Sequence, residues 1–419
     1  MSRGGENKEG AETMPEASSQ LAKCRTWMCV LILVLVATVG CREPGRSSLE
    51  ASAAQYTLGG ELGERGDLDG AIAAFREAIR LKPNYPEAHY GLGVALGRSG
   101  HTDAATAAFR EAVRLRPDFS EAYCGLGVSL SHEGSCDEAI TAFREAIRLK
   151  PDYSEAHRGL GRLLSRSGDL DGAIAVLREA IRLTPNNPEA HCDLAQALIC
   201  KGNTDRAIAA CREAVKLKPD YPGAHCNLGI ALGMKGDTDG AIAALREAIR
   251  LAPNDSEAHY NLGVSLRKKG DTEGAIAAFR EATRLRPSLW EAHYALGRFA
   301  EDKRDNDGAT TSYREAIRFN PNCTAAHYGL GVALGRKGDV DGAIAAFREA
   351  IRLEPNAPEA QYNLGLYLER KRDLDGAVAA YREALRLKPE FPAARRKLDA
   401  ALLLLKQAGK THGLFDSRD

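Results

Sequence analysis

The sequence predicts an all-α protein built from tandem helical hairpins, and three observations support this prediction. Apolar residues recur at helical spacing in two stretches of each interval. Glycine followed by aspartate separates the two stretches in several intervals, as at Gly66-Asp67. Prolines recur every 34 residues, at 83, 117, 151, 185, 219, 253, 287, 321, 355 and 389. A fixed period of this length indicates a repeat array, so one array replaces the two or three domains that 419 residues would otherwise suggest.

Each repeat is expected to contain a helix A and a helix B. Counted from two residues after each proline, ten full repeats run from 52–85 to 358–391. Gly66 can take the left-handed conformation that ends helix A, and Asp67 can cap the first amides of helix B. Ser135 and Glu138 have the spacing of a capping box. Four A helices begin on a proline, which suits a first helical turn: Pro86, Pro188, Pro222 and Pro358.

Small residues recur where the two helices of a hairpin would touch. Alanine holds one place in all ten repeats, and glycine holds another with Ala195 as the exception. Phe75 and its bulky counterparts are expected to fill the space between these small residues. Cys211 is the undersized member of that set, so we expect a local packing weakness there.

This pattern resembles the tetratricopeptide repeat, which is recognised in the second repeat by the residues Leu92-Gly93, Ala105, Phe109, Ala112 and Pro117. The resemblance implies a right-handed α-solenoid (a superhelix) of ten hairpins in which helix A lines the inner groove. A terminal repeat needs a solvent-facing cover, and residues 392–406 are expected to form that capping helix. A polar tail, 407–419, follows.

The N-terminus contains an apolar segment, 27–40, within an uncharged run of sixteen residues from Thr26 to Cys41. The run is shorter than the roughly 20 residues that span a bilayer, and it suits the core of a signal peptide. The sequence "TVGC" at its end resembles the lipobox of bacterial lipoproteins, although Thr38 departs from the usual bulky aliphatic residue. The resemblance implies lipidation of Cys41.

An uncleaved single-span anchor is the alternative to a lipoprotein, and Met14 is an alternative start to Met1. Residues 42–51 are expected to be a linker. Either anchor would tether the repeats to a membrane outside the cytoplasm, in a bacterial envelope.

Composition and motifs argue against several functions. The chain has 57 basic and 57 acidic residues, without the basic excess of a nucleic-acid binder. We therefore expect no nucleic-acid partner. The segment "GKT" at 409–411 lacks the upstream glycine of a phosphate-binding loop. Since no catalytic motif or cofactor fingerprint occurs, the chain is expected to be non-enzymatic and to hold no cofactor.

The histidines and cysteines also suggest structural roles. A single zinc ion needs its ligands within about 2.1 Å, and histidines at the same place in different repeats are too far apart to approach one ion this closely. We therefore expect no metal, and we expect the aligned histidine side chains to pack against the neighbouring helix. The seven cysteines within the repeats are odd in number and are expected to be unpaired. Seven histidines share one place in helix A, at 89, 157, 191, 225, 259, 293 and 327.

The candidate binding residues lie on one stripe of helix A, formed by the fifth, ninth and thirteenth residues of each repeat. By the resemblance, this stripe faces the groove. Arg158, Arg162 and Arg166 occupy it in the fourth repeat and could hold a carboxylate or phosphate. Tolerated surface variation is the alternative explanation of this arginine row. Paired basic residues on helix B, such as Arg76 and Arg80, are expected to be a solvated outer face because a glutamate accompanies each pair.

The fifth residue of the C-terminal repeats is a tyrosine, an amphipathic side chain that is favoured at binding surfaces but is also common in ordinary packing. These residues are Tyr260, Tyr294, Tyr328 and Tyr362. Asparagine stands next to this row in three repeats, and some peptide-binding members of the family use asparagine there to hold a peptide backbone. These residues are Asn227, Asn261 and Asn363.

The sequence thus predicts a membrane-tethered scaffold whose groove binds an extended peptide or protein segment. The alternative is an accessory subunit that presents substrate to an envelope enzyme such as a glycosyltransferase. The repeats also resemble those that precede the catalytic region of O-linked N-acetylglucosaminyltransferases. Only 28 residues follow the last repeat, so we do not expect that activity here.

Overall fold

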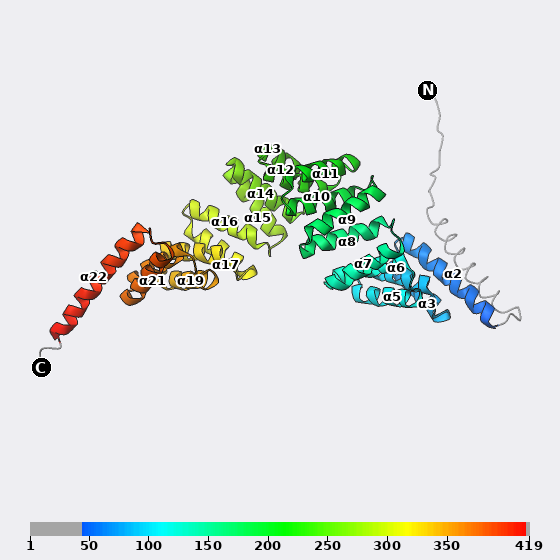
Figure 1. The fold of residues 1–419 in the computed structure, drawn as a ribbon, viewed down its shortest axis with the longest axis horizontal. Helices are drawn as coiled ribbons and strands as arrows, with labels where there is room; N and C mark the ends of the chain where they lie inside the picture. The colour runs from blue at the N-terminus through cyan, green and yellow to red at the C-terminus, as the bar shows by residue number, and fades with distance from the viewer. Residues whose placement is uncertain (1–43, 416–419) are drawn as a thin grey trace, which may run out of the picture. The chain divides into compact units, whose positions relative to one another are not determined.

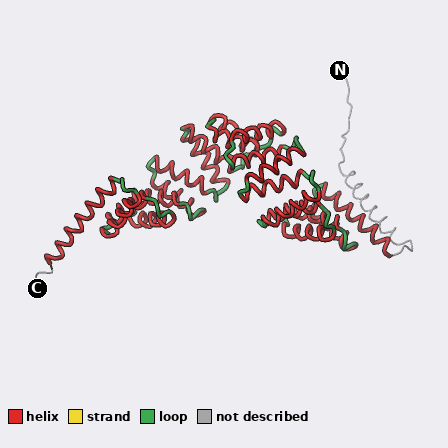
Figure 2. The backbone as a smooth tube through the Cα atoms, viewed as in Figure 1, coloured by secondary structure: helices red, strands yellow, loops and turns green. Residues whose placement is uncertain are grey.

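The computed structural model describes residues 44–415, and the side chains of residues 48–407. This part of the chain forms 21 helices joined by short loops, and it contains no strand (Figure 2). The predicted all-α solenoid of helical hairpins is therefore confirmed. The A helices are α2 (Pro44–Glu64), α4 (Pro86–Arg98), α6 (Ser120–Glu133), α8 (Ser154–Ser167), α10 (Pro188–Cys200), α12 (Pro222–Lys235), α14 (Ser256–Lys269), α16 (Trp290–Asp302), α18 (Thr324–Lys337) and α20 (Pro358–Arg370). The B helices are α3 (Leu68–Leu81), α5 (Thr102–Leu115), α7 (Cys136–Leu149), α9 (Leu170–Leu183), α11 (Thr204–Leu217), α13 (Thr238–Leu251), α15 (Thr272–Leu285), α17 (Asn306–Phe319), α19 (Val340–Leu353) and α21 (Leu374–Leu387).

The helices belong to two compact bodies, with the boundary after Pro151. The N-terminal body holds α2–α7 and the C-terminal body begins with α8. Within each body a B helix packs against the A helix of its own repeat and the A helix of the next repeat. The C-terminal body ends in α22 (Pro392–Phe415), which packs on α21 at the end labelled C in Figure 1.

The predicted stop and start signals are present where glycine is followed by aspartate, as at Gly66-Asp67. Gly66 has a φ of +83°, a conformation in which a side chain would be strained. Asp67 then accepts a hydrogen bond from the Gly70 amide at 2.9 Å, which caps α3. The predicted capping box at Ser135 is wrong, because the Ser135 side chain makes no capping bond. Its expected partner Glu138 instead forms an ion pair with Arg110 at 2.8 Å.

The core of a repeat depends on the close approach of glycine to a large side chain of helix B. A Cβ atom on Gly93 would lie 2.8 Å from the ring of Phe109. The fifth repeat solves the same problem differently, since Ala195 replaces the glycine and the small Cys211 replaces the large side chain. Both residues are fully buried. Ala195 therefore offsets the packing weakness that Cys211 alone would cause.

Both ends of the array extend further as helix than expected. Helix α2 begins at Pro44, so most of the predicted linker 42–51 is helical, with proline in the first turn where it is well tolerated. Helix α22 continues past the predicted end at residue 406 as far as Phe415. The apolar segment 27–40 and Cys41 lie outside the described residues. Of the helices that the structure describes, none combines the length and apolar character needed to cross a bilayer.

Six of the seven aligned histidines make the same hydrogen bond, and His293 also stacks on Phe319 of α17, in line with the expected packing against a neighbouring helix. Their Nε2 atoms lie 2.8–3.0 Å from the carbonyl oxygen of the proline six residues earlier, as in His89 and Pro83. Since a carbonyl accepts, each ring donates. The histidine thus fixes the loop that enters helix A. Six of the repeat cysteines are free thiols, as predicted: Cys136, Cys192, Cys200, Cys211, Cys226 and Cys323.

Candidate functional site

The predicted stripe of helix A lines a hollow in each body. In the N-terminal body, Val94, Arg98, Val128 and His132 contribute to a hollow of about 500 Å³. These are the ninth and thirteenth residues of two consecutive A helices. Hollows also occur elsewhere, so a hollow alone does not define a site. In the C-terminal body, a hollow of about 470 Å³ is lined by stripe residues of α16 and α18: Tyr294, Arg298, Asp302 and Tyr328.

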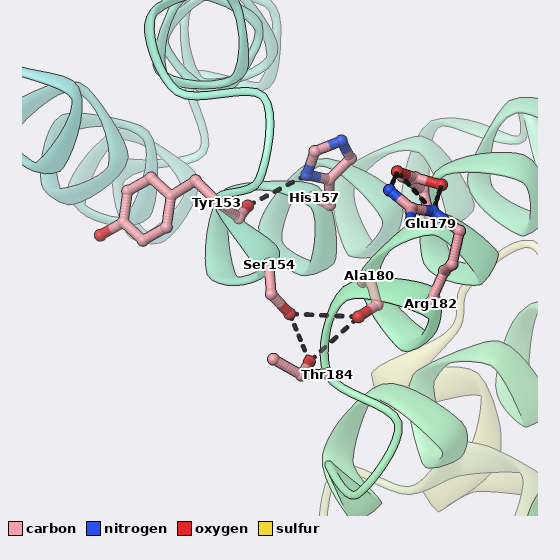
Figure 3. Close-up of polar contacts among 7 residues, drawn as sticks. All are labelled: Tyr153, Ser154, His157, Glu179, Ala180, Arg182 and Thr184. Carbon is pink, nitrogen blue, oxygen red and sulfur yellow. Dashed lines mark hydrogen bonds and ion pairs between the residues drawn. The ribbon is translucent and has the colours of Figure 1, made fainter.

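The helix that carries the arginine row is anchored through its first turn (Figure 3). Ser154 is buried, and its hydroxyl donates to the Ala180 carbonyl at 3.2 Å and lies 2.6 Å from the Thr184 hydroxyl. The Nδ1 atom of His157 lies 3.0 Å from the Tyr153 carbonyl oxygen. The start of α8 is therefore held against the end of α9 by Ser154, four residues before Arg158.

The arginine row is not a set of three free cations. Arg158 is 29% exposed, and its Nη1 atom lies 4.0 Å from Oδ2 of Asp193, whose side chain is 16% exposed. Arg162 and Arg166 are exposed and have no ion pair within 4 Å in the described part of the chain. The structure thus brings Arg158 to a carboxylate of the next A helix and leaves the other two facing solvent.

Asp193 is a site residue that the sequence interpretation missed. Burial raises the pKa of this carboxyl to about 6, against the opposing effect of Arg158 and Arg162. Its Oδ2 atom is buried and accepts no hydrogen bond from the described residues. A signal was available, because Asp193 is the acidic residue at a place where the other repeats have glycine, asparagine, alanine or threonine.

The predicted tyrosine row is held in place by packing as well as exposed to the groove. Its members are half-buried, and each ring packs on the aromatic residue of its own helix B, with centroids 5.6–5.9 Å apart. Arg298 donates to the Tyr294 hydroxyl at 3.4 Å. Of the four tyrosines, Tyr294 and Tyr328 line one hollow together. Rings held in this way form a rigid surface, which lowers the ordering cost of binding.

The predicted asparagines are engaged with their neighbours. Asn227 donates to the Cys192 carbonyl at 3.3 Å, and Asn363 donates to the Tyr328 hydroxyl at 2.8 Å. Asn261 donates within its own helix, to the Glu257 carbonyl at 2.9 Å. The amides of Asn227 and Asn363 therefore join consecutive A helices, and that of Asn261 bonds within its own helix. The three amides do not form a continuous ladder along the groove.

The outer face differs from the groove in its charge pairing, as predicted. On helix B, Arg80 lies 2.7 Å from Glu77, three residues earlier, and the corresponding pair recurs in the later repeats. The bond from Arg80 lowers the pKa of the Glu77 carboxyl. The outer arginines of this set are thus matched one to one with carboxylates.

Two sequence models match the chain. Residues 33–261 match the model described as the C-terminal domain of cilia and flagella-associated protein 70. Residues 260–323, 294–353 and 328–392 match the tetratricopeptide repeat. The chain belongs to this tetratricopeptide-repeat family. No curated protein matches the sequence.

Solved structures are similar to this tetratricopeptide-repeat chain in fold. Human IFIT1, solved as a dimer with PPP-AAAA, is 18% identical, with 82% of this chain and 86% of that chain covered and a TM-score of 0.50. Yeast Tom70 is 16% identical, with 85% and 96% covered and a TM-score of 0.40. The pilF protein of Pseudomonas aeruginosa is 20% identical, with 51% and 96% covered and a TM-score of 0.45.

Proposed function

We propose that this tetratricopeptide-repeat protein is a non-enzymatic scaffold whose A-helix stripe binds an extended peptide or protein segment. The observation that carries the proposal is the contrast between the two faces. The stripe residues vary from repeat to repeat and line hollows, whereas the outer arginines that follow a glutamate by three residues recur along the array and are paired with it. Variation beside invariant packing positions is expected where a surface reads a partner.

A quantitative pull-down from a detergent extract of cells that contain the protein tests this proposal. The groove variant is Arg162→Ala/Arg166→Ala, which leaves the Arg158–Asp193 pair intact. The matched control is Arg246→Ala/Arg280→Ala, which removes two exposed arginines of the outer helices. Circular dichroism establishes that both variants are folded. We expect partners to be retained by the wild type and the control and lost from the groove variant.

Other outcomes of the pull-down have distinct meanings. Equal loss from both variants would indicate general charge attraction and would contradict a groove site at these arginines. Equal retention by both would identify the arginine row as surface variation. A stable enzyme among the partners would favour the accessory-subunit function over a scaffold.

We also propose that the N-terminal segment tethers the protein to a membrane, with the repeats outside the cytoplasm. Support comes from the apolar stretch 27–40 and the "TVGC" sequence that ends at Cys41. The test is incorporation of labelled palmitate by the wild type and by Cys41→Ser in a bacterial host. We expect the wild type to be labelled and Cys41→Ser to lack the label. We also expect protease added to spheroplasts to cleave the repeats. Absence of label from both proteins would contradict lipidation and leave a single-span anchor to be tested by carbonate extraction.

A further inference from the structure

The hollow between α16 and α18 has an acidic lining. Glu301, Asp302, Glu354 and Glu359 contribute four carboxylates, against one lining cation, Arg298. Two of the carboxylates already have partners, because Arg336 lies 3.6 Å from Glu301 and Lys388 lies 3.0 Å from Glu359. Asp302 and Glu354 have no ion pair within 4 Å among the described residues. Two carboxylates are therefore left to face the hollow.

Both of these residues reverse the charge that their places usually carry. The place of Asp302 is occupied by arginine or lysine in five other repeats: Arg98, Arg166, Lys268, Arg336 and Arg370. The place of Glu354 is basic in six other repeats: Lys82, Arg116, Lys150, Lys218, Arg286 and Lys388. Since the two reversals come from consecutive repeats and meet at one hollow, the acidic character is local to this part of the groove.

An adjoining hollow offers a further unpartnered acceptor. It has a volume of about 480 Å³ and shares Glu301 and Asp302 with the first hollow. Asn306 lines it, and the buried Oδ1 atom of Asn306 accepts no hydrogen bond from the described residues. A buried acceptor without a donor is costly unless a donor arrives from outside. Arg304 and Arg336 also line this second hollow, so cations are already present there, and the excess of carboxylates belongs to the first hollow.

The walls of the hollow suit the stem of a long side chain. Tyr294 and Tyr328 flank it, with their rings fixed against Tyr313 and Phe347 of helix B. Aliphatic stems of lysine and arginine pack on aromatic faces, and their cationic heads are attracted to these rings as well as to carboxylates. An acidic partner side chain would meet two carboxylates that have no ion pair within 4 Å among the described residues, and an apolar side chain would leave them desolvated.

We propose that this hollow binds a lysine or arginine side chain of the extended partner segment, between Tyr294 and Tyr328, with its cation directed at Asp302 and Glu354. The inference rests on the proposed peptide-binding function and specifies part of the partner sequence. The basic residue of the partner then places the bound segment over α16 and α18 of the C-terminal body.

Selection of a displayed random-peptide library on the full-length chain tests the proposal. Three proteins are used in parallel: the wild type, Asp302→Asn/Glu354→Gln, and the matched control Asp118→Asn/Glu390→Gln. The control removes two exposed carboxylates that do not line the hollow. We expect peptides recovered on the wild type and the control to share one aligned lysine or arginine. On Asp302→Asn/Glu354→Gln this requirement disappears, and a resynthesised peptide binds about five- to tenfold more weakly.

The outcomes separate this inference from the function on which it rests. Peptides that bind without a shared basic residue, or a basic requirement that survives in Asp302→Asn/Glu354→Gln, would overturn the inference and leave peptide binding intact. Recovery of no peptide above the starting library on any of the three proteins would overturn peptide binding and the inference together. Thermal unfolding of each variant excludes loss of fold as the cause.

Discussion

Asp193 is the residue whose burial has the clearest thermodynamic consequence. Its pKa is raised from 3.8 to about 6 in the folded protein, so the protonated form is favoured by folding. The stabilisation is therefore present below about pH 4, where the unfolded chain also binds the proton, and is lost as the pH rises towards 6. Above pH 6 the protein carries a buried, incompletely paired carboxylate.

Asp193→Asn is expected to be more stable than the wild type at pH 7, by about 1–3 kcal/mol, and equally stable at pH 4. Urea unfolding at the two pH values measures this difference, with the exposed Asp118→Asn as control. If Asp193→Asn were less stable at pH 7, the ion pair with Arg158 would outweigh the cost of burial, and our description of Asp193 would be wrong.

Burial should decide which cysteine thiols react in the native protein. Burial raises the pKa of Cys192 to about 11, and that of Cys211 and of Cys226 to about 12, whereas Cys200 is exposed. Thiolate is the reactive form, so we expect iodoacetamide at pH 8 to modify Cys200 in the native protein. The three buried thiols should react only in denaturant. Mass spectrometry of the labelled peptides measures this, and rapid native labelling of Cys211 would contradict the packing described for α11.

At the scale of the helical hairpin, Ala195 and Cys211 should be energetically coupled. Cys211→Phe is expected to destabilise the protein by about 1–3 kcal/mol, because the ring would meet the Cβ atom of Ala195. At the equivalent glycine a Cβ lies 2.8 Å from the ring. The double variant Ala195→Gly/Cys211→Phe recreates the pairing of Gly331 with Phe347 in the ninth repeat and should recover most of the loss. Denaturant unfolding of the four proteins gives the coupling energy, and additive effects would argue against this compensation.

The hairpins could be predicted from sequence because their signals are local. The start and stop of a helix depend on residues within one turn, such as Gly66 and Asp67, and the 34-residue period brings that signal back in several repeats. The false capping box at Ser135 shows the limit of local reasoning. Its glutamate is drawn to Arg110 of the preceding helix B, a contact that no pattern within α7 reveals.

The polar contacts of the groove were harder to predict because they join different places in neighbouring repeats. Arg158–Asp193, Asn227–Cys192 and Asn363–Tyr328 are all separated by 35 residues, one more than the period. The two partners of each contact therefore hold different places in their repeats. A comparison of equivalent places from repeat to repeat does not show that they are neighbours. The stripe itself was predicted from helical geometry, whereas the hollow at Asp302 and Glu354 depends on where the end of α16 meets the residues that follow α19 of the next repeat.

At the scale of the whole molecule, the net charge of zero hides a local arrangement. Within the C-terminal body the groove carries exposed arginines on α8 and unpaired carboxylates near α16, while the outer arginines that follow glutamate are paired with it. Binding specificity depends on where unpaired charges lie on the surface. A chain whose basic and acidic residues are equal in number can therefore still bind its partners selectively.

The central claim, that partners bind the A-helix stripe, is tested most directly by photo-crosslinking. A photoreactive amino acid is placed at Gln196 or Val264, the ninth residue of their repeats, or at Arg246 or Arg280 on the outer helices. Each protein is irradiated with a peptide recovered by display selection, and crosslinked product is quantified. We predict product from at least one stripe position and none above background from the outer positions. Product from the outer positions alone would contradict binding in the groove.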